Sequence, residues 1–164
     1  MSQTSESDRI VIRPARPDEG PTLSALAFRS KAYWGYDASF MTACVKELTI
    51  SQEALGSNPA YVIEEAGCIF GFYTLVRLNE EEVDLGHLFV EPEKIGQGYG
   101  GRLMRHAKAM AAALGYRAMI IQGDPHAEPF YRAMGGEWIG RKPSESIPGR
   151  DLPLFRIELE RSSA

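Results

Sequence analysis

The chain has 164 residues, of which 44% are hydrophobic and 24% charged, a size and composition typical of one soluble globular domain. The net charge of -4 argues against a nucleic-acid-binding protein, because such proteins usually carry a basic face. The two cysteines form no CxxC pair, the polar residues 1–8 are not expected to be a signal peptide, and no apolar run approaches the roughly 20 residues that span a bilayer. We therefore expect a cytoplasmic protein without a disulfide framework, a metal site or a membrane partner.

The N-terminal part of the chain predicts one strand and two helices. The β-branched run Ile10–Ile12 predicts a short strand, and prolines follow it. Apolar residues at helical spacing predict a helix from about Glu19 to Lys31 and a second from Ser39 to Leu48. A polar connection follows. The ends, residues 1–8 and 161–164, are expected to be flexible tails around a single domain of residues 9–160.

The middle of the chain predicts an antiparallel meander. Tyr61–Ile63, Ile69–Leu78 and Val83–Val90 are apolar and β-branched runs separated by short turns. A dipeptide such as Ala66-Gly67 suits the first of these turns.

The C-terminal part changes to alternating strands and helices. Gly98–Leu114 has an apolar helical face, Ala118–Gln122 reads as a buried strand, and a short helix is expected near Ala127–Met134. The strand–helix–strand order predicts a right-handed crossover and a parallel strand pair. Two strands near Glu137–Arg141 and Leu154–Leu159 complete the expected fold, an α/β domain with a mixed, mostly antiparallel sheet flanked by helices.

A glycine-rich loop, Glu91–Gly101, joins the third meander strand to the long helix. Four of its eleven residues are glycine, which permits positive φ and close approach of the backbone to a ligand. The free N–H groups of the following helix start attract an anion, and a pyrophosphate is the natural ligand. A merely flexible loop is the alternative interpretation.

The same loop also satisfies the dinucleotide fingerprint GxGxxG at Gly96, Gly98 and Gly101, with Asp124 at the position of the expected acid. Against a nicotinamide-binding domain, five residues separate the strand from the first glycine, and the preceding strands form a meander. No Gly-Lys-Ser/Thr follows, so the loop is not a Walker A motif.

Two segments together resemble the GCN5-related N-acetyltransferase (GNAT) family. Leu88-Phe89-Val90-Glu91-Pro92 followed by Ile95-Gly96-Gln97-Gly98-Tyr99-Gly100 is similar to the family's first motif, with Ile95 where Arg or Gln is preferred. Asp124 to Gly135 is similar to its second motif, Asn-x-x-Ala-x-x-Phe-Tyr, with Asp124 in place of Asn. The order of elements fits the family from Arg9 to Leu159.

The resemblance implies that acetyl-CoA lies between the strand ending at Val90 and the strand Ala118–Gln122. Its pantetheine would pair with backbone groups of Leu88 and Val90, and its pyrophosphate with the loop amides, near the charge of Lys94. The resemblance thus assigns the cofactor to Leu88, Phe89, Val90, Lys94, Ile95, Gly96, Gln97, Gly98, Tyr99, Gly100, Gly101, Asp124, Ala127, Phe130 and Tyr131.

Two residues are the catalytic candidates. The resemblance makes Tyr131 the acid that protonates the departing thiolate, since a phenol keeps its proton at neutral pH; a packing aromatic is the alternative. Asp84 is the first choice of base, on the strand face expected to hold Gly86, Leu88 and Val90. Alternation places His87 on the opposite face unless a bulge redirects the strand. An N–H near Phe89 or Val90 is expected to stabilise the oxyanion.

Tyr33, Trp34 and Tyr36 form an aromatic cluster between the first two helices. The resemblance places the acceptor site there, although these rings could equally pack the helices onto the sheet. The implied activity is acetyl transfer to a primary amine of a small molecule or protein, in a possible homodimer. The alternatives are a non-catalytic CoA-binding sensor and a nicotinamide-dependent oxidoreductase.

Overall fold

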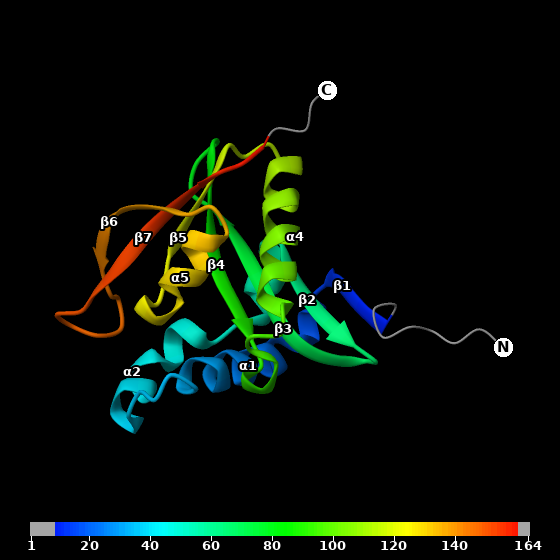
Figure 1. Cartoon of the computed structure of the whole chain (residues 1–164). Coiled ribbons are helices and arrows are strands. Elements are labelled where there is room, and N and C mark those ends of the chain that lie inside the picture. Colours follow the sequence, from blue (N-terminus) through cyan, green and yellow to red (C-terminus); the bar gives the residue numbers. More distant parts are fainter. Residues whose placement is uncertain (1–8, 161–164) are drawn as a thin grey trace.

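The structure, a computed structural model, describes residues 9–160 as a seven-stranded sheet with helices on both faces (Figure 1). The strand order is β1-β2-β3-β4-β5-β7-β6, and only the pair β4 and β5 is parallel. The mixed, mostly antiparallel sheet expected from the sequence is confirmed. The strands are β1 (Ile10–Pro14), β2 (Ala60–Glu65), β3 (Cys68–Arg77), β4 (Glu82–Val90), β5 (Ala118–Gln122), β6 (Glu137–Pro143) and β7 (Asp151–Glu158). The predicted tails lie outside the described residues.

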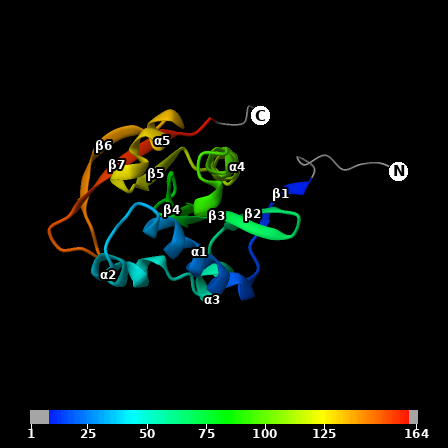
Figure 2. The same ribbon diagram turned by 60° about the horizontal axis from the view of Figure 1, so that its bottom comes forward.

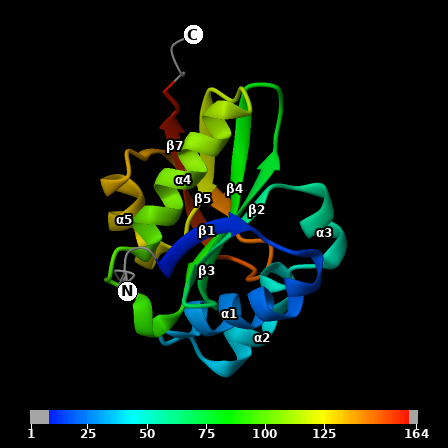
Figure 3. The ribbon, with the colours of Figure 1, turned by 90° about the vertical axis from the view of Figure 1, so that its right-hand side faces the viewer.

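The helices divide between the two faces of the sheet, as Figures 2 and 3 show. One face carries α1 (Gly20–Ala32), α2 (Ala38–Leu48) and α3 (Gln52–Ser57); the other carries α4 (Tyr99–Ala113) and α5 (Glu128–Ala133). Helix α3 lies where the sequence predicts only a polar connection. It forms because the Ser51 hydroxyl caps it, accepting from Ala54 N–H at 3.0 Å, and because Leu55 is buried.

The sheet is buried on both faces. Phe72 and Tyr73 are consecutive in β3, point to opposite faces, and are both fully buried. Phe72 packs in the core beneath α1 and α2, with Leu23 and Leu26, whereas Tyr73 packs in the core beneath α4, with Leu103. The strands that line the site are therefore fixed from two sides.

A β-bulge in β4 corrects the predicted orientation of the candidate base. Thr74 pairs with His87 and Leu75 with Leu85, so Gly86 has no partner on β3. The extra residue reverses the alternation, which places Asp84 and His87 on the face of α1 and α2. Leu88 and Val90 lie on the α4 face instead, so the prediction that Asp84 shares their face is wrong.

No helix within residues 9–160 combines the length and the apolar character needed to cross a membrane. In the same part of the chain no three His, Cys, Asp or Glu side chains gather where they could hold a metal ion.

Candidate active site

The parallel strands β4 and β5 (Figure 1) separate after three paired residues. A cleft lined by residues of β4 and of the segment after β5 lies there. The ladder of the two strands ends at the pair Asp84 and Ile120; β5 then continues along β7, while β4 continues along β3. The Glu91 N–H donates to Phe70 C=O on β3 at 2.8 Å. Because backbone direction alternates, Phe89 also faces β3, whereas Leu88 and Val90 turn their N–H and C=O groups to the open side.

The cleft has a volume of about 650 Å³. Its walls come from β4, the glycine loop, the ends of α1 and α2, the segment after β5, and the β6–β7 loop. Of the residues predicted to bind the cofactor, those that line it are Leu88, Phe89, Val90, Lys94, Ile95, Gly96, Gly98, Gly100, Gly101, Asp124, Ala127, Phe130 and Tyr131.

The glycine loop brings unpaired backbone donors to one end of the cleft. Gly96 and Gly98 adopt φ of +84° and +89°, and a Cβ built on either would meet nothing within 4 Å. Gly98 caps α4, and the first backbone hydrogen bond of the helix runs from Arg102 N–H to Gly98 C=O. The N–H groups of the three residues between them therefore have no partner within the helix, and the open space fits an anionic ligand.

Two residues of this loop do not turn their side chains to the cleft. The Gln97 amide donates to Glu93 C=O at 2.8 Å, and the buried Tyr99 hydroxyl donates to Glu65. Neither residue lines the cleft, and the Gln97 N–H donates to Lys94 C=O at 3.2 Å, so the predicted contact of Gln97 with the cofactor is not supported. Lys94 lines the cleft while its ammonium lies 4.6 Å from the centre of the Phe70 ring.

Asp84 and His87 lie together on the α1–α2 face of β4, where both line the cleft. Burial raises the pKa of Asp84, and the charge of Lys142 only partly opposes this. His87 bonds Thr74 Oγ1 at 2.8 Å through Nδ1 and Glu47 C=O at 3.0 Å through Nε2. A carbonyl can only accept, so Nε2 carries the proton and Nδ1 accepts from Thr74. Burial lowers the pKa of His87, so the ring stays neutral. Its hydrogen bonds to β3 and to the end of α2 tie α2 to the sheet.

Tyr131 is buried at the wall of the cleft and carries a free hydroxyl. A Cβ at Gly123 would lie 2.8 Å from its ring, so a glycine is needed for this packing against β7 residue Phe155. Within residues 9–160 no group hydrogen-bonds to the hydroxyl. Burial, and then the charge of Asp124, raise the pKa of Tyr131, so the phenol stays protonated at neutral pH.

The three aromatic residues predicted at the acceptor site have different surroundings. Trp34 lines the cleft and stacks on His126, with ring centres 5.1 Å apart. Tyr36 donates its hydroxyl proton to Asp124 at 2.7 Å and stacks on Phe40. Tyr33 is 53% exposed and does not line the cleft.

The sequence missed several cleft residues because they lie outside any motif. Lys31 comes from the end of α1, Gln122 ends β5, and Glu145 and Leu152 flank the β6–β7 turn. Their side chains converge only through the tertiary fold. The helical periodicity of α1 and α2 gave the one available signal, since it fixed where those helices end.

Comparison with known proteins shows which acetyltransferases this chain is similar to. Residues 56–135 match the family model described as acetyltransferase (GNAT) domain. Over 150 residues the chain is 29% identical to peptidyl-lysine N-acetyltransferase YjaB from Salmonella typhimurium, covering 90% of this chain and 97% of that protein. The chain is thus similar to the GNAT family in sequence, most directly over residues 56–135.

Solved structures share the GNAT fold across the domain. A GCN5-related N-acetyltransferase from Rhodopseudomonas palustris superposes with a TM-score of 0.74 at 17% identity, covering 97% of this chain and 99% of that one. The PaiA N-acetyltransferase from Thermoplasma acidophilum, solved in complex with coenzyme A, gives 0.72 at 17% identity, covering 91% and 98%. A GNAT family acetyltransferase from Elizabethkingia anophelis, with acetyl-CoA bound, gives 0.67 at 18% identity, covering 93% and 99%.

Proposed function

We propose that this GNAT domain transfers an acetyl group from acetyl-CoA to a primary amine. The separation of β4 from β5 beside the glycine loop carries the proposal. The separation leaves backbone groups of Leu88 and Val90 open to an extended ligand. The start of α4 provides unpaired amides for a pyrophosphate, and the absence of side chains at Gly96 and Gly98 leaves room for it. Pantetheine and pyrophosphate have this chemistry in this order.

The residues of the cleft supply the chemistry that amine acetylation needs, once acetyl-CoA provides an acetyl group activated as a thioester. Asp84 takes the proton of the amine, directly or through water, and its raised pKa makes it a better base than an ordinary aspartate. The Val90 N–H donates to the carbonyl oxygen as negative charge develops there. Tyr131 gives its proton to the leaving sulfur.

Asp84, Trp34 and Glu47 line the same cleft, so an amine held near Asp84 would lie in a space that also borders an aromatic ring and a carboxylate. The name of the Salmonella relative supports lysine side chains as the first acceptors to test. Peptides with an internal lysine and small primary amines should therefore be compared in one panel.

Two measurements test this function. Calorimetric titration with acetyl-CoA, with NADH as control, should show binding of acetyl-CoA alone. Release of the CoA thiol should then depend on an added amine. Binding without turnover on any amine would favour the CoA-binding sensor, and binding of NADH alone would contradict the proposed cofactor.

We further propose that the protein works in the cytoplasm, which the free thiols of Cys44 and the exposed Cys68 support because neither is consumed in a disulfide. Cell fractionation tests the location. The homodimer implied by the resemblance remains a prediction, for which light scattering coupled to size-exclusion chromatography is the direct measurement.

A further inference from the structure

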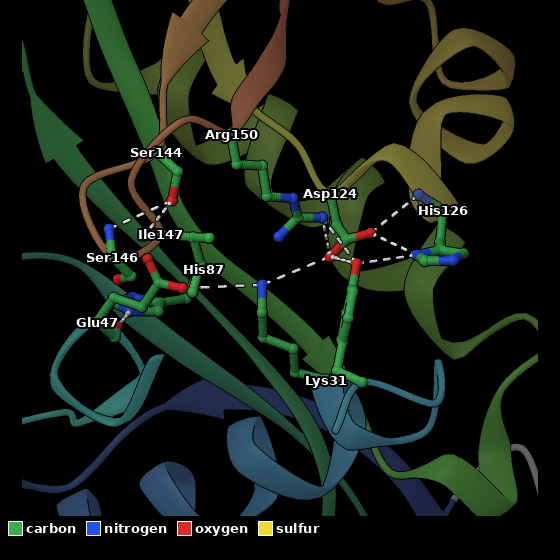
Figure 4. Close-up of polar contacts among 10 residues, drawn as sticks. Lys31, Glu47, His87, Asp124, His126, Ser144, Ser146, Ile147 and Arg150 are labelled. Carbon is green, nitrogen blue, oxygen red and sulfur yellow. Dashed lines mark hydrogen bonds and ion pairs between the residues drawn. The ribbon is translucent and has the colours of Figure 1, made fainter. Parts of the chain in front are cut away.

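Asp124 is the centre of a polar cluster that joins three distant parts of the chain (Figure 4). Its carboxylate accepts from Tyr36 Oη at 2.7 Å and from the backbone N–H of His126 at 2.9 Å. Lys31 Nζ lies 3.4 Å and Arg150 Nη2 3.8 Å from the same Oδ2. The partners come from α1 and the turn after it, from the segment after β5, and from the β6–β7 loop. We call these five residues the Asp124 cluster.

The cluster gives a physical reason for a carboxylate at a position where the family pattern has an amide. Two cations converge on one oxygen of Asp124, and a neutral amide would remove the counter-charge of Arg150 and leave Lys31 with Glu47 alone. Burial by itself would raise the pKa of Asp124, but the hydrogen bonds from Tyr36 and His126 and the charge of Lys31 hold it below its usual range. The carboxylate is engaged with the protein itself and is only 16% exposed.

Arg150 connects the cluster to the β6–β7 loop. Its guanidinium lies 5.2 Å from the centre of the Tyr36 ring and 4.8 Å from that of Phe40, and it donates to the Tyr36 hydroxyl at 2.8 Å. The loop is folded around Ser144, whose Oγ accepts from the backbone N–H groups of Ser146 and Ile147. Ile147 packs into the core beneath α1 and α2. The loop is thus held against the helices at Ile147 and at Arg150.

The parts that the cluster joins are also the walls of the acceptor end of the cleft. Lys31 is only 11% exposed and lies between Asp124 and Glu47, at 3.7 Å from the latter. Trp34, Glu145 and Leu152 line the cleft from the same segments. The glycine loop, at the other end, makes no contact with the cluster among the described hydrogen bonds and ion pairs.

We propose that Asp124 is a positioning residue for the acceptor amine: it clamps the α1–α2 turn to the β6–β7 loop and so sets the shape of the acceptor wall. This role presupposes the acetyl transfer proposed above. It differs from the cofactor contact that the family resemblance assigns to this position.

The test uses Asp124→Asn in the full-length protein, because the amide keeps the size and the cap on His126 but removes the charge. We expect KM for the amine to rise about tenfold, which is within the range for residues coupled through one network, while KM for acetyl-CoA changes less than twofold. Asp37→Asn is the matched control: it removes a charge from the same turn, outside the cluster, and retains a residue that caps α2 well. Its kinetics should equal those of the wild type.

Two further readouts separate positioning from a general loss of structure. Arg150→Gln should raise the acceptor KM similarly, and the double variant should be no worse than either single one, because both remove the same ion pair. Hydrogen exchange of residues 144–150 should become faster in Asp124→Asn and remain at the wild-type rate in Asp37→Asn.

An increase in KM for acetyl-CoA with an unchanged acceptor KM would overturn the proposal and return Asp124 to the cofactor. Additive effects of the two substitutions, or unchanged exchange of residues 144–150, would show that no clamp exists. If the wild-type protein binds acetyl-CoA but acetylates no amine, the proposed function fails and the acceptor role with it. The exchange rates would then still decide whether the cluster holds the loop.

Discussion

Substituting Gly98 by Val tests the phosphate-binding role of the glycine loop most directly. Gly98 has φ of +89° and caps α4 beside the unpaired N–H groups. A Val side chain would project into open space at the cleft and displace the ligand from those donors. Loss of one or two charge-assisted hydrogen bonds, worth about 2–4 kcal/mol together, would weaken acetyl-CoA binding about 30- to 700-fold.

Gly67→Val separates this effect from backbone strain. Gly67 lies in the β2–β3 turn with φ of +85°, and a Cβ there also meets nothing within 4 Å. Both variants force a β-branched residue into the left-handed region, at a cost of about 1–2 kcal/mol, so both should lower Tm by a few degrees. Only Gly98→Val should lose affinity in calorimetry. Equal acetyl-CoA affinities of the two variants would refute the phosphate-loop assignment.

Three other predictions concern the proposed chemistry. Tyr131→Phe should lower kcat about 10²-fold with little change in acetyl-CoA affinity, whereas wild-type kcat at neutral pH would mean that Tyr131 only packs. Asp84→Asn should lower kcat about 10²-fold and abolish the acid limb of the kcat/KM profile, a limb that in the wild type should lie above the ordinary carboxyl pKa of about 3.9. The raised pKa of Asp84 means that the folded protein binds this proton more tightly than the unfolded chain does. Wild-type stability should therefore fall as pH rises between the ordinary and the raised pKa. Asp84→Asn should have a higher Tm than the wild type at pH 7, and a lower Tm would contradict this sign.

Local sequence patterns were sufficient for the elements and for the cofactor end of the cleft. The order β2-β3-β4 follows from the short turns of the meander, and the parallel pair from the strand–helix–strand sequence, whereas the position of β7 between β5 and β6 did not follow from the sequence. The glycine loop is contiguous, and its function depends on backbone geometry that the glycines themselves permit. Phe130 and Tyr131 were assigned to the cofactor by their place in the family's second motif, and both line the cleft from one short helix.

The acceptor end depended on contacts between distant segments. The bulge at Gly86 arises from how β4 pairs with β3, and it moved Asp84 and His87 to one face against the alternation expected from β4 alone. In the sequence, Asp124 stands where the family's second motif has Asn. Its carboxylate meets Lys31 and Arg150, 93 residues before it and 26 after it, only when the sheet brings three segments together. The sequence by itself therefore determined the fold class and the cofactor end of the cleft, because strand and helix patterns and the glycine loop depend on residues that are neighbours along the chain. The tertiary structure decided the acceptor wall, because strand register and long-range charge pairing set which side chains meet there.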